Sequence, residues 1–294
     1  MKLEYKILWL DDQIQSFIDD EVIQEVEEYL IEQGFQPNII TVSRSEDFFK
    51  KLDDSFDLIL TDYHLNDLNG DEVIKKLRSQ DYSVMSEVLF YTAKADLKDT
   101  DKINRVSFLE TNTLLGNHRE EVLKATTNLI GLTIKKFQNI IAMRGMIMQE
   151  TSSLDVEMEN ILHDILEKSE NPNELINQIK SRYIKSNNDF NKQIEKLVDT
   201  ERILRQIGAS HRWRAIKRSL DDGNIKSLLN EYEKQIISVR NKFAHAELIV
   251  EGDRQFFKDR REDIDFNEEF CKDIRENIIK HKSNLVELKT SLED

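Results

Sequence analysis

Five short apolar runs, separated by helical patterns, constrain the fold of this chain more than any other feature. They are rich in β-branched and aromatic residues and cover 5–10, 38–42, 57–61, 87–92 and 105–109. Continuous apolar runs of this length are typical of strands buried on both faces of a parallel sheet. Amphipathic helical patterns cover 17–34, 45–52 (with Ser45 as the expected N-cap) and 70–77. The alternation predicts an α/β doubly wound five-stranded parallel sheet.

Polar side chains stand where these predicted strands end. Asp11 and Asp12 follow the first run, Asp62 follows the third, and Thr92 ends the fourth. Ligands of open α/β sheets bind beyond the carboxyl ends of the strands, where the strand order reverses. Three carboxylates gathered there would repel one another, and a hard divalent cation such as Mg²⁺ would relieve the repulsion. An Asp beside such an ion can attack a phosphoryl group, and a Thr hydroxyl can bind its oxygen.

Residues 1–116 resemble a response-regulator receiver domain, which has the flavodoxin-like fold. The resemblance rests on Asp11 and Asp12 after KILWL, Asp62 in DLILTDYHL, Gly70, and Thr92 in VLFYTAKAD. It implies that Asp62 is the phosphoacceptor for a sensor histidine kinase or phosphotransfer protein, and that Thr92 is the switch residue. It also implies that Asp11, Asp12 and Asp62 are the protein ligands of Mg²⁺. The alternative is that these acids only cap helices or lie in solvated loops.

One position departs from the receiver pattern. The pattern expects a Lys at the end of the fifth strand, but the sequence reads VSFLETN and places Glu110 there. Lys94 and Lys102 are near in sequence but outside the expected place. A carboxylate would oppose an incoming phosphoryl dianion. Two alternatives follow: phosphorylation acts through an altered geometry, or the domain signals without phosphorylation.

The charge of the chain is unevenly distributed. The formal net charge is −15, and residues 1–120 carry 13 Lys and Arg against 26 Asp and Glu, a net charge of −13. Residues 175–218 carry 11 basic and 4 acidic residues, so a local basic face could meet phosphates. A single cysteine, Cys271, excludes an intrachain disulfide and a thiolate-cluster metal site. Without a long apolar run, we expect a cytoplasmic protein with no membrane partner.

The remainder of the chain has helical periodicity. We expect a receiver domain at 1–118, a connecting helix at 119–150 and an all-α bundle at 151–294. The predicted helices of the bundle cover 154–166, 173–184, 190–207, 225–244 and 270–292. A small hairpin is expected around Gly252 and Asp253. The connecting helix either transmits a signal or is simply two core helices that meet.

The sequence RNKFAH, at the end of the predicted helix 225–244, gathers three polar residues. Asn241 and His245 are four residues apart and share a helix face, and Arg240 lies next to them. His245 can exchange a proton at neutral pH. Arg240 can stabilise charge on a phosphate, and Asn241 can orient His245 or a phosphate oxygen. The alternative is that an Arg and a His only cap the helix C-terminus.

RNKFAH resembles the R-N-x-x-x-H motif of HEPN domains, an all-helical family that includes many RNA-cleaving nucleases. The resemblance loosely covers residues 150–294 and implies catalysis by Arg240, Asn241 and His245 in a homodimer, because such sites usually assemble from two facing motifs. The nucleophile would be the 2′-OH of the RNA, so the cleavage needs no cofactor. Arg212, Trp213 and Arg214 could hold the RNA by stacking and phosphate contacts, unless they form a charged helix face with Trp213 buried.

These features together predict a two-component-type response regulator with a HEPN-like effector, a signal-gated and metal-independent endoribonuclease that cleaves RNA by 2′-OH transesterification. The alternative is a non-catalytic two-component adaptor whose helical domain dimerises or binds a protein partner.

Overall fold

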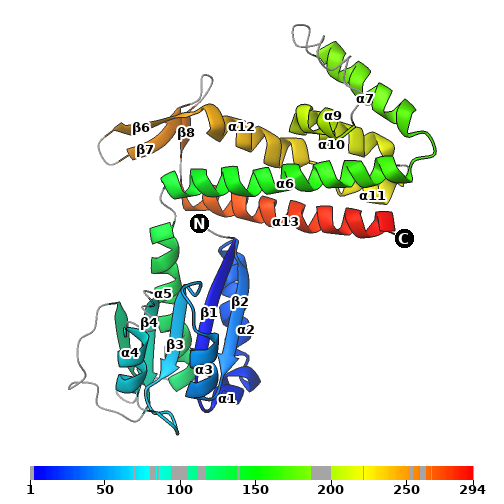
Figure 1. Ribbon diagram of the computed structural model, residues 1–294. Coiled ribbons are helices and arrows are strands. Elements are labelled where there is room, and N and C mark those ends of the chain that lie inside the picture. Colours follow the sequence, from blue (N-terminus) through cyan, green and yellow to red (C-terminus); the bar gives the residue numbers. More distant parts are fainter. Residues whose placement is uncertain are drawn as a thin grey trace. The chain divides into compact units, whose positions relative to one another are not determined.

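The chain forms two compact units in the computed structural model, the α/β unit (Met1–Asn139) and the helical unit (Ile140–Asp294). The structure describes residues 3–68, 70–79, 84, 86–93, 105–111, 117–137, 140–186, 200–220, 222–251, 254–258, 263–265 and 267–293. Figure 1 labels the helices and strands of both units.

The α/β unit contains the predicted five-stranded parallel sheet. Its strands are β1 (Glu4–Leu10), β2 (Gln36–Val42), β3 (Leu58–Asp62), β4 (Glu87–Thr92) and β5 (Val106–Glu110). All neighbouring strands are parallel and the order is β2-β1-β3-β4-β5. The strand order therefore reverses between β1 and β3, which is where a doubly wound sheet binds its ligand.

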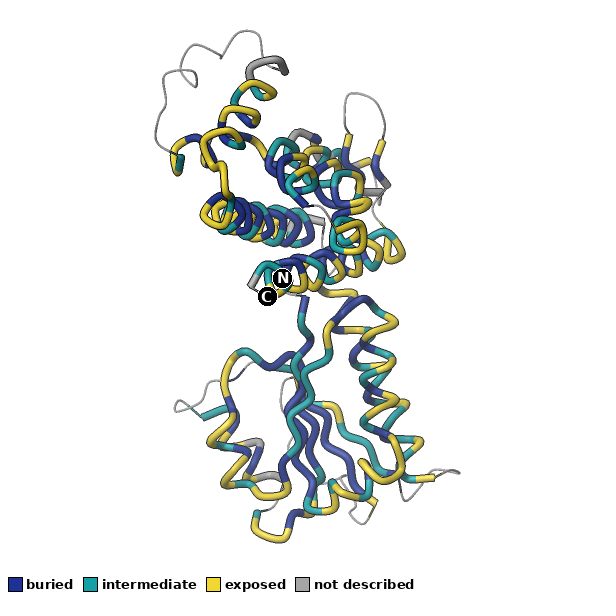
Figure 2. Tube along the Cα trace, turned by 90° about the vertical axis from the view of Figure 1, so that its right-hand side faces the viewer, coloured by how far each residue is buried: buried dark blue, intermediate teal, exposed yellow. Residues whose placement is uncertain are grey.

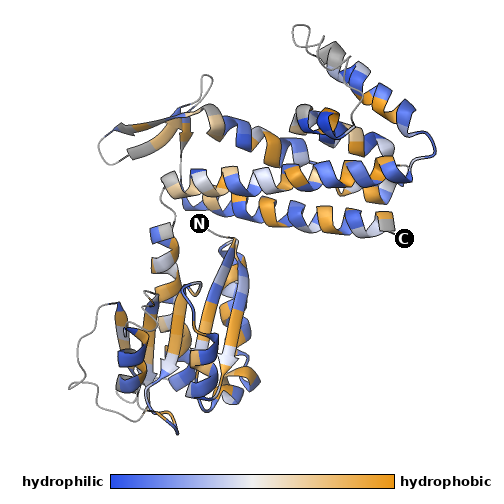
Figure 3. Cartoon of the chain, in the orientation of Figure 1, coloured by the Kyte–Doolittle hydropathy of each residue, from blue (hydrophilic) through white to orange (hydrophobic). Residues whose placement is uncertain are grey.

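Helices cover both faces of this sheet. The helices are α1 (Ile14–Asp19), α2 (Val22–Glu32), α3 (Ser45–Lys51), α4 (Gly70–Leu77) and α5 (His118–Phe137). Alternate residues of β1 divide between two cores: Trp9 packs with residues of α1, α2 and α5, and Leu10 packs with residues of α3 and α4. Burial on both faces explains the apolar character of the inner strands β1, β3 and β4, and Figure 3 colours much of the sheet as hydrophobic.

Two local predictions in the α/β unit need correction. The helical pattern at 17–34 is interrupted at Glu21, which has the left-handed φ of 60°, so α1 and α2 are separate helices. Ser45 is the first residue of α3 rather than its N-cap, which is Arg44. The Asp67 carboxylate instead accepts hydrogen bonds from the Ser45 backbone N–H (3.0 Å) and the Ser45 hydroxyl (2.7 Å). A residue distant in sequence therefore caps this helix.

The helical unit is built around one long helix. Its helices are α6 (Ile140–Lys168), α7 (Pro172–Ser186), α9 (Thr200–Gln206), α10 (Ala209–Ser219), α11 (Gly223–Ser227), the π-helix η3 (Glu233–Ile237), α12 (Ser238–His245) and α13 (Glu268–Glu293). The long helix α6 packs against α13, α10 and α12. The predicted stripe Leu154, Met158 and Ile161 is buried. Figure 2 shows buried and exposed residues alternating along the helices of this unit. No described helix has the length and hydropathy needed to cross a bilayer.

The predicted connecting helix at 119–150 is divided between the two units. Val122, Ile130 and Ile134 of α5 are buried in the core of the α/β unit. Met143 and Ile147, near the start of α6, are buried in the helical unit. Residues 138–139 lie outside the described residues. Each part of the predicted segment therefore serves as a core helix of its own unit.

The region predicted as one helix at 225–244 is interrupted. Residues 228–231 form turns, and Glu231 has a left-handed φ of 62°. The chain then passes through η3 into α12. Tyr232, Ile236 and Phe243 are nevertheless buried, as the periodicity predicted. An apolar stripe thus identified the buried face but not the break.

The helical unit also contains strands, so the predicted all-α bundle is corrected. Strands β6 (Glu247–Glu251), β7 (Arg254–Lys258) and β8 (Asp263–Asp265) form an antiparallel sheet in sequence order. β6 and β7 form the predicted hairpin, although Gly252 and Asp253 lie outside the described residues.

Candidate functional site

The carboxyl ends of β1 and β3 bring three acidic side chains together. One carboxylate oxygen each of Asp11, Asp12 and Asp62 lies within 4.8 Å of the others. Asp11 is buried, and the other two are half-buried. The loop after β1 directs Asp11 inward, because its Oδ1 accepts a hydrogen bond from the Gln13 backbone N–H at 2.6 Å. The spacing suits a small cation that prefers oxygen ligands, such as Mg²⁺.

Burial and mutual repulsion alter the acidity of Asp62. The pKa of Asp62 is raised from 3.8 to about 6, first by desolvation and further by the charges of Asp11 and Asp12. The His64 backbone N–H opposes this rise by donating to Asp62 Oδ1 at 3.3 Å. Asp62 is therefore mostly ionised at neutral pH, and a cation among the three carboxylates would ionise it further.

Two aromatic residues that the sequence analysis did not select support this acidic cluster. The Tyr91 hydroxyl donates to Asp11 Oδ2 at 2.5 Å, and the Trp9 indole N–H donates to the Tyr91 oxygen at 2.7 Å. Both aromatic side chains are fully buried. Buried Tyr and Trp polar atoms require partners, so a Tyr directly before Thr92 was an available signal. Burial raises the pKa of Asp11, and the Tyr91 hydrogen bond partly offsets this effect.

The ends of β4 and β5 hold the predicted switch residue and the departure from the receiver pattern. Thr92 is buried and lies opposite Glu110 in the register of β4 and β5. The next residue, Thr111, donates from its hydroxyl to the Thr92 carbonyl at 3.1 Å. Thr111 also shares a hydrogen bond with His118 Nδ1 at the start of α5. A carboxylate therefore occupies the strand end where a Lys was expected, while Lys94 and Lys102 lie outside the described residues.

Comparison with protein families identifies this part of the chain. The family described as "Response regulator receiver domain" matches residues 17–108. Residues 17–108 are a response regulator receiver domain. The match contains Asp62 and Thr92, and the acidic pair of the receiver domain comes just before it. A receiver domain implies a phosphodonor partner such as a histidine kinase.

Individual proteins also resemble part of the chain. The "Probable transcriptional regulator ycf29" of Porphyra purpurea is 36% identical over 84 residues, which are 29% of this chain and 40% of that relative. Chemotaxis response regulator CheY4 of Vibrio cholerae is 19% identical and covers 42% of this chain and 98% of its own, with a TM-score of 0.31. A response regulator receiver domain protein from Clostridium thermocellum is 20% identical and covers 43% of this chain and 94% of its own, with a TM-score of 0.30.

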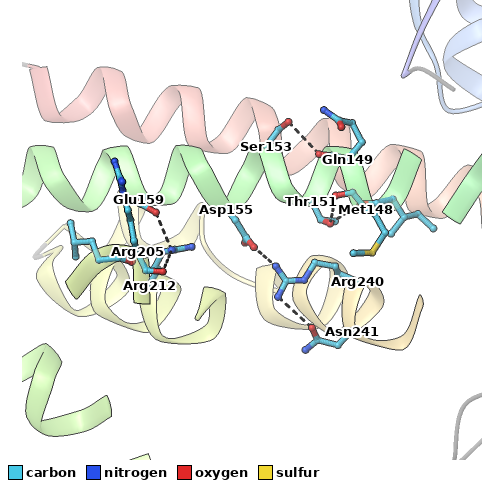
Figure 4. A network of polar contacts seen from close by, with 12 residues as sticks. Met148, Gln149, Thr151, Ser153, Asp155, Glu159, Arg205, Arg212, Arg240 and Asn241 are labelled. Carbon is cyan, nitrogen blue, oxygen red and sulfur yellow. Dashed lines mark hydrogen bonds and ion pairs between the residues drawn. The ribbon is translucent and has the colours of Figure 1, made fainter. Parts of the chain in front are cut away.

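The RNKFAH sequence forms the end of α12, the helix that packs on α6. Arg240 Nη1 forms an ion pair with Asp155 Oδ2 of α6, and Arg240 Nη2 lies 3.4 Å from Asn241 Oδ1 (Figure 4). The Arg240 and Asp155 side chains are half-buried, and Asn241 is exposed. His245 is the last residue of α12, but its side chain lies outside the described residues. The structure therefore joins Arg240 and Asn241 and adds Asp155, which sequence reasoning missed.

The three residues predicted to hold RNA have different surroundings on α10. Arg212 is buried: its Nε donates to the Leu204 carbonyl at 3.0 Å, and its Nη2 lies 3.0 Å from Glu159 Oε2 (Figure 4). These bonds tie α10 to α6 and α9, so we assign Arg212 a structural role in place of the predicted RNA contact. A buried guanidinium whose donors are engaged by acceptors of the same unit is not available to a phosphate.

Trp213 and Arg214 also have partners within the helical unit. The Trp213 indole N–H donates to the Leu229 carbonyl at 2.9 Å, and Lys217 Nζ lies 5.4 Å from the centroid of the Trp213 ring. Arg214 is exposed, and its Nη2 donates to Glu233 Oε1 at 2.8 Å. Of the three, only Arg214 has an exposed side chain.

Proposed function

We propose that the protein is a two-component response regulator that accepts a phosphoryl group on Asp62 and thereby controls an effector formed by the helical unit. The observation that carries the first half is the convergence of Asp11, Asp12 and Asp62 within 4.8 Å at the reversal of strand order. These three residues would hold Mg²⁺, which, when bound, neutralises charge on a phosphoryl group.

The residues of the receiver domain have separate roles in this transfer. An Asp62 oxygen forms the new bond to phosphorus while the phosphorus–nitrogen bond of a phosphohistidine breaks, and the imidazole leaves with the electron pair. Burial of Tyr91 and its hydrogen bond to Asp11 keep that ligand oriented. Thr92 then responds to the phosphoryl oxygens as the switch residue. Glu110 opposes the incoming dianion, so we expect a slower transfer than a Lys would allow.

The second half of the proposal concerns the effector. We infer that the helical unit is a metal-independent endoribonuclease of the HEPN type, active as a homodimer and cytoplasmic. The pairing of Arg240 with Asp155 and Asn241 supports it, because these contacts hold the guanidinium beside Asn241 on α12, the helix that ends at His245. The 2′-OH of the RNA attacks phosphorus and the bond to the 5′ oxygen breaks, leaving a 2′,3′-cyclic phosphate. His245 exchanges the protons.

A second candidate function is favoured by one observation. The ion pair between Arg240 and Asp155 is satisfied within the unit, as a purely structural Arg would be. A non-catalytic adaptor, whose helical unit dimerises or binds a protein, would need nothing more from these residues. The relative from Porphyra purpurea is named a probable transcriptional regulator, but this chain matches 40% of its length.

Cleavage of end-labelled RNA separates the two candidates. The full chain is incubated with an RNA pool, with EDTA or Mg²⁺ and with or without acetyl phosphate as phosphodonor. We expect cleavage that persists in EDTA and falls by about 10²-fold or more in His245→Ala and Arg240→Ala, since each loses a transition-state interaction. Lys242→Ala, at the first unspecified position of the R-N-x-x-x-H motif, is the matched control. Absence of cleavage in every state would favour the adaptor.

Asp62→Asn tests the receiver half separately. This variant should accept no phosphoryl group from acetyl phosphate, measured as a mobility shift in a phosphate-affinity gel, while Asp67→Asn should still accept it. Asp67 caps α3 from the loop after β3 and lies outside the acidic cluster. Equal phosphorylation of the wild type and the Asp62 variant would contradict the assignment.

A further inference from the structure

Helices α7 and α10 enclose a groove that no role assigned so far uses. Its volume is about 580 Å³, and the described residues that line it all belong to these two helices. Leu175 and Ile179 from α7 and Ala215 from α10 supply an apolar surface. Positions 175 and 179 are one helical turn apart, so one face of α7 points into the groove. A volume of this size is typical of sites for small molecules rather than of gaps in packing.

Positive charge from both helices meets in this groove. Arg182 comes from α7, and His211, Arg214 and Arg218 come from α10. Among the described residues that line the groove there is no carboxylate. Arg214 shares its charge with Glu233, whereas neither Arg182 nor Arg218 forms an ion pair with another described residue. Burial lowers the pKa of His211, and the Arg214 charge lowers it further.

This arrangement is unfavourable for two helices that only pack together. Facing positions of packed helices usually pair apolar side chains or opposite charges, and like charges across a gap cost free energy. Arg182, Arg214 and Arg218 are exposed, and an anion that entered between the two helices would meet guanidinium groups from both of them. Guanidinium groups suit phosphate in particular, because their planar forks match its oxygens with two parallel hydrogen bonds.

We propose that the groove between α7 and α10 binds a phosphate-bearing small molecule of nucleotide size. Its phosphates would lie between Arg182, Arg214 and Arg218, and its uncharged part would lie against Leu175 and Ile179. The volume of about 580 Å³ favours a small ligand over a nucleic-acid strand. This binding is independent of RNA cleavage, so it would stand if the helical unit were an adaptor.

Isothermal titration calorimetry on the full chain tests the proposal with ATP as the probe. We expect saturable binding of ATP and none of adenosine, since the phosphates supply the recognition. The double variant Arg182→Gln and Arg218→Gln should bind ATP at least about tenfold more weakly, because two charge-assisted contacts are lost. The matched control replaces Arg205 and Lys217 with Gln, which removes the same charge from α9 and α10 outside the groove.

Three outcomes would overturn the proposal: no binding of ATP, equal weakening in both double variants, or tighter binding of a 12-nucleotide RNA than of ATP that the same Arg182 and Arg218 changes abolish. Thermal melting followed by circular dichroism shows whether the groove variant is folded. The groove variant should melt at or above the wild-type temperature without ligand, because its substitutions remove repulsion. If it melts lower, the single variant Arg218→Gln replaces it in the titration.

Discussion

The two units handle their buried charges in opposite ways. In the receiver domain, Asp11, Asp12 and Asp62 crowd like charges at the end of the sheet. In the helical unit, Arg240 pairs with Asp155, and Arg212 pairs with Glu159. A cluster of like charges is unfavourable by itself and implies a ligand that completes it, whereas opposite charges compensate each other, so that removing one leaves the other uncompensated. Removing one charge should therefore destabilise the helical unit and stabilise the receiver domain.

The largest expected effect is on the buried Arg of α10. Arg212→Met keeps the length of the side chain but removes its bonds to Leu204 and Glu159, leaving the Leu204 carbonyl without this donor and Glu159 with only its longer ion pair to Arg205 (3.7 Å). We expect a loss of about 3 kcal/mol in the free energy of unfolding, measured with urea. The exposed Arg214→Met, on the same helix, should cost under about 1 kcal/mol. Equal losses would show that Arg212 is not a structural tie.

The second effect tests the other ion pair. Asp155→Asn removes the counter-charge of the half-buried Arg240, and we expect a loss of about 2 kcal/mol in the free energy of unfolding. Asp164→Asn, on the same helix and outside this pair, serves as the control. A melting temperature unchanged in the first variant would mean that solvent satisfies Arg240, and the comparison between the units would weaken.

The third effect concerns the neutral donor inside the acidic cluster. Tyr91→Phe deprives Asp11 of a hydrogen bond and the Trp9 N–H of its acceptor, so we expect a loss of about 1–2 kcal/mol. A double-mutant cycle with Trp9→Phe, read by chemical denaturation, should show coupling between the two positions. Additive losses would indicate that the hydrogen bonds from Trp9 to Tyr91 and from Tyr91 to Asp11 do not act together.

The smallest effect has the opposite sign. The pKa of Asp62 is raised to about 6 in the folded protein, above its ordinary 3.8, so its ionisation opposes folding. Without Mg²⁺, stability should fall as pH rises from about 4 to about 6, and the full penalty remains above that range. Asp62→Asn should flatten this fall and be more stable than the wild type at pH 7, because it has no carboxyl group to ionise in the folded protein. Melting curves measured across pH test this prediction: the wild type should gain stability as the pH is lowered through that range. An Asp62→Asn variant that is less stable than the wild type at pH 7 would reverse the comparison.

Much of the receiver domain could be predicted from local pattern. The apolar runs located every strand within two residues, and they placed Asp62 at the end of β3. Parallel strands end at the same edge of a sheet, so Asp11 and Asp62 had to meet once the strand order was known. The break at Glu231 was not predictable in the same way, because an amphipathic stripe continues across a turn when both sides pack on one core.

The sequence by itself determined which apolar positions are buried, because these positions repeat with the period of each helix or strand. It also determined which acids follow the strands. Only the tertiary structure decided the partners of these residues. Tyr91 reaches Asp11 from 80 residues away, and Arg240 reaches Asp155 from 85. Arg212 and Arg214 differ by two positions in the same basic stretch, yet one is buried and the other lines a groove. Periodicity fixes the direction of a side chain, but the neighbour that it meets depends on how distant elements pack.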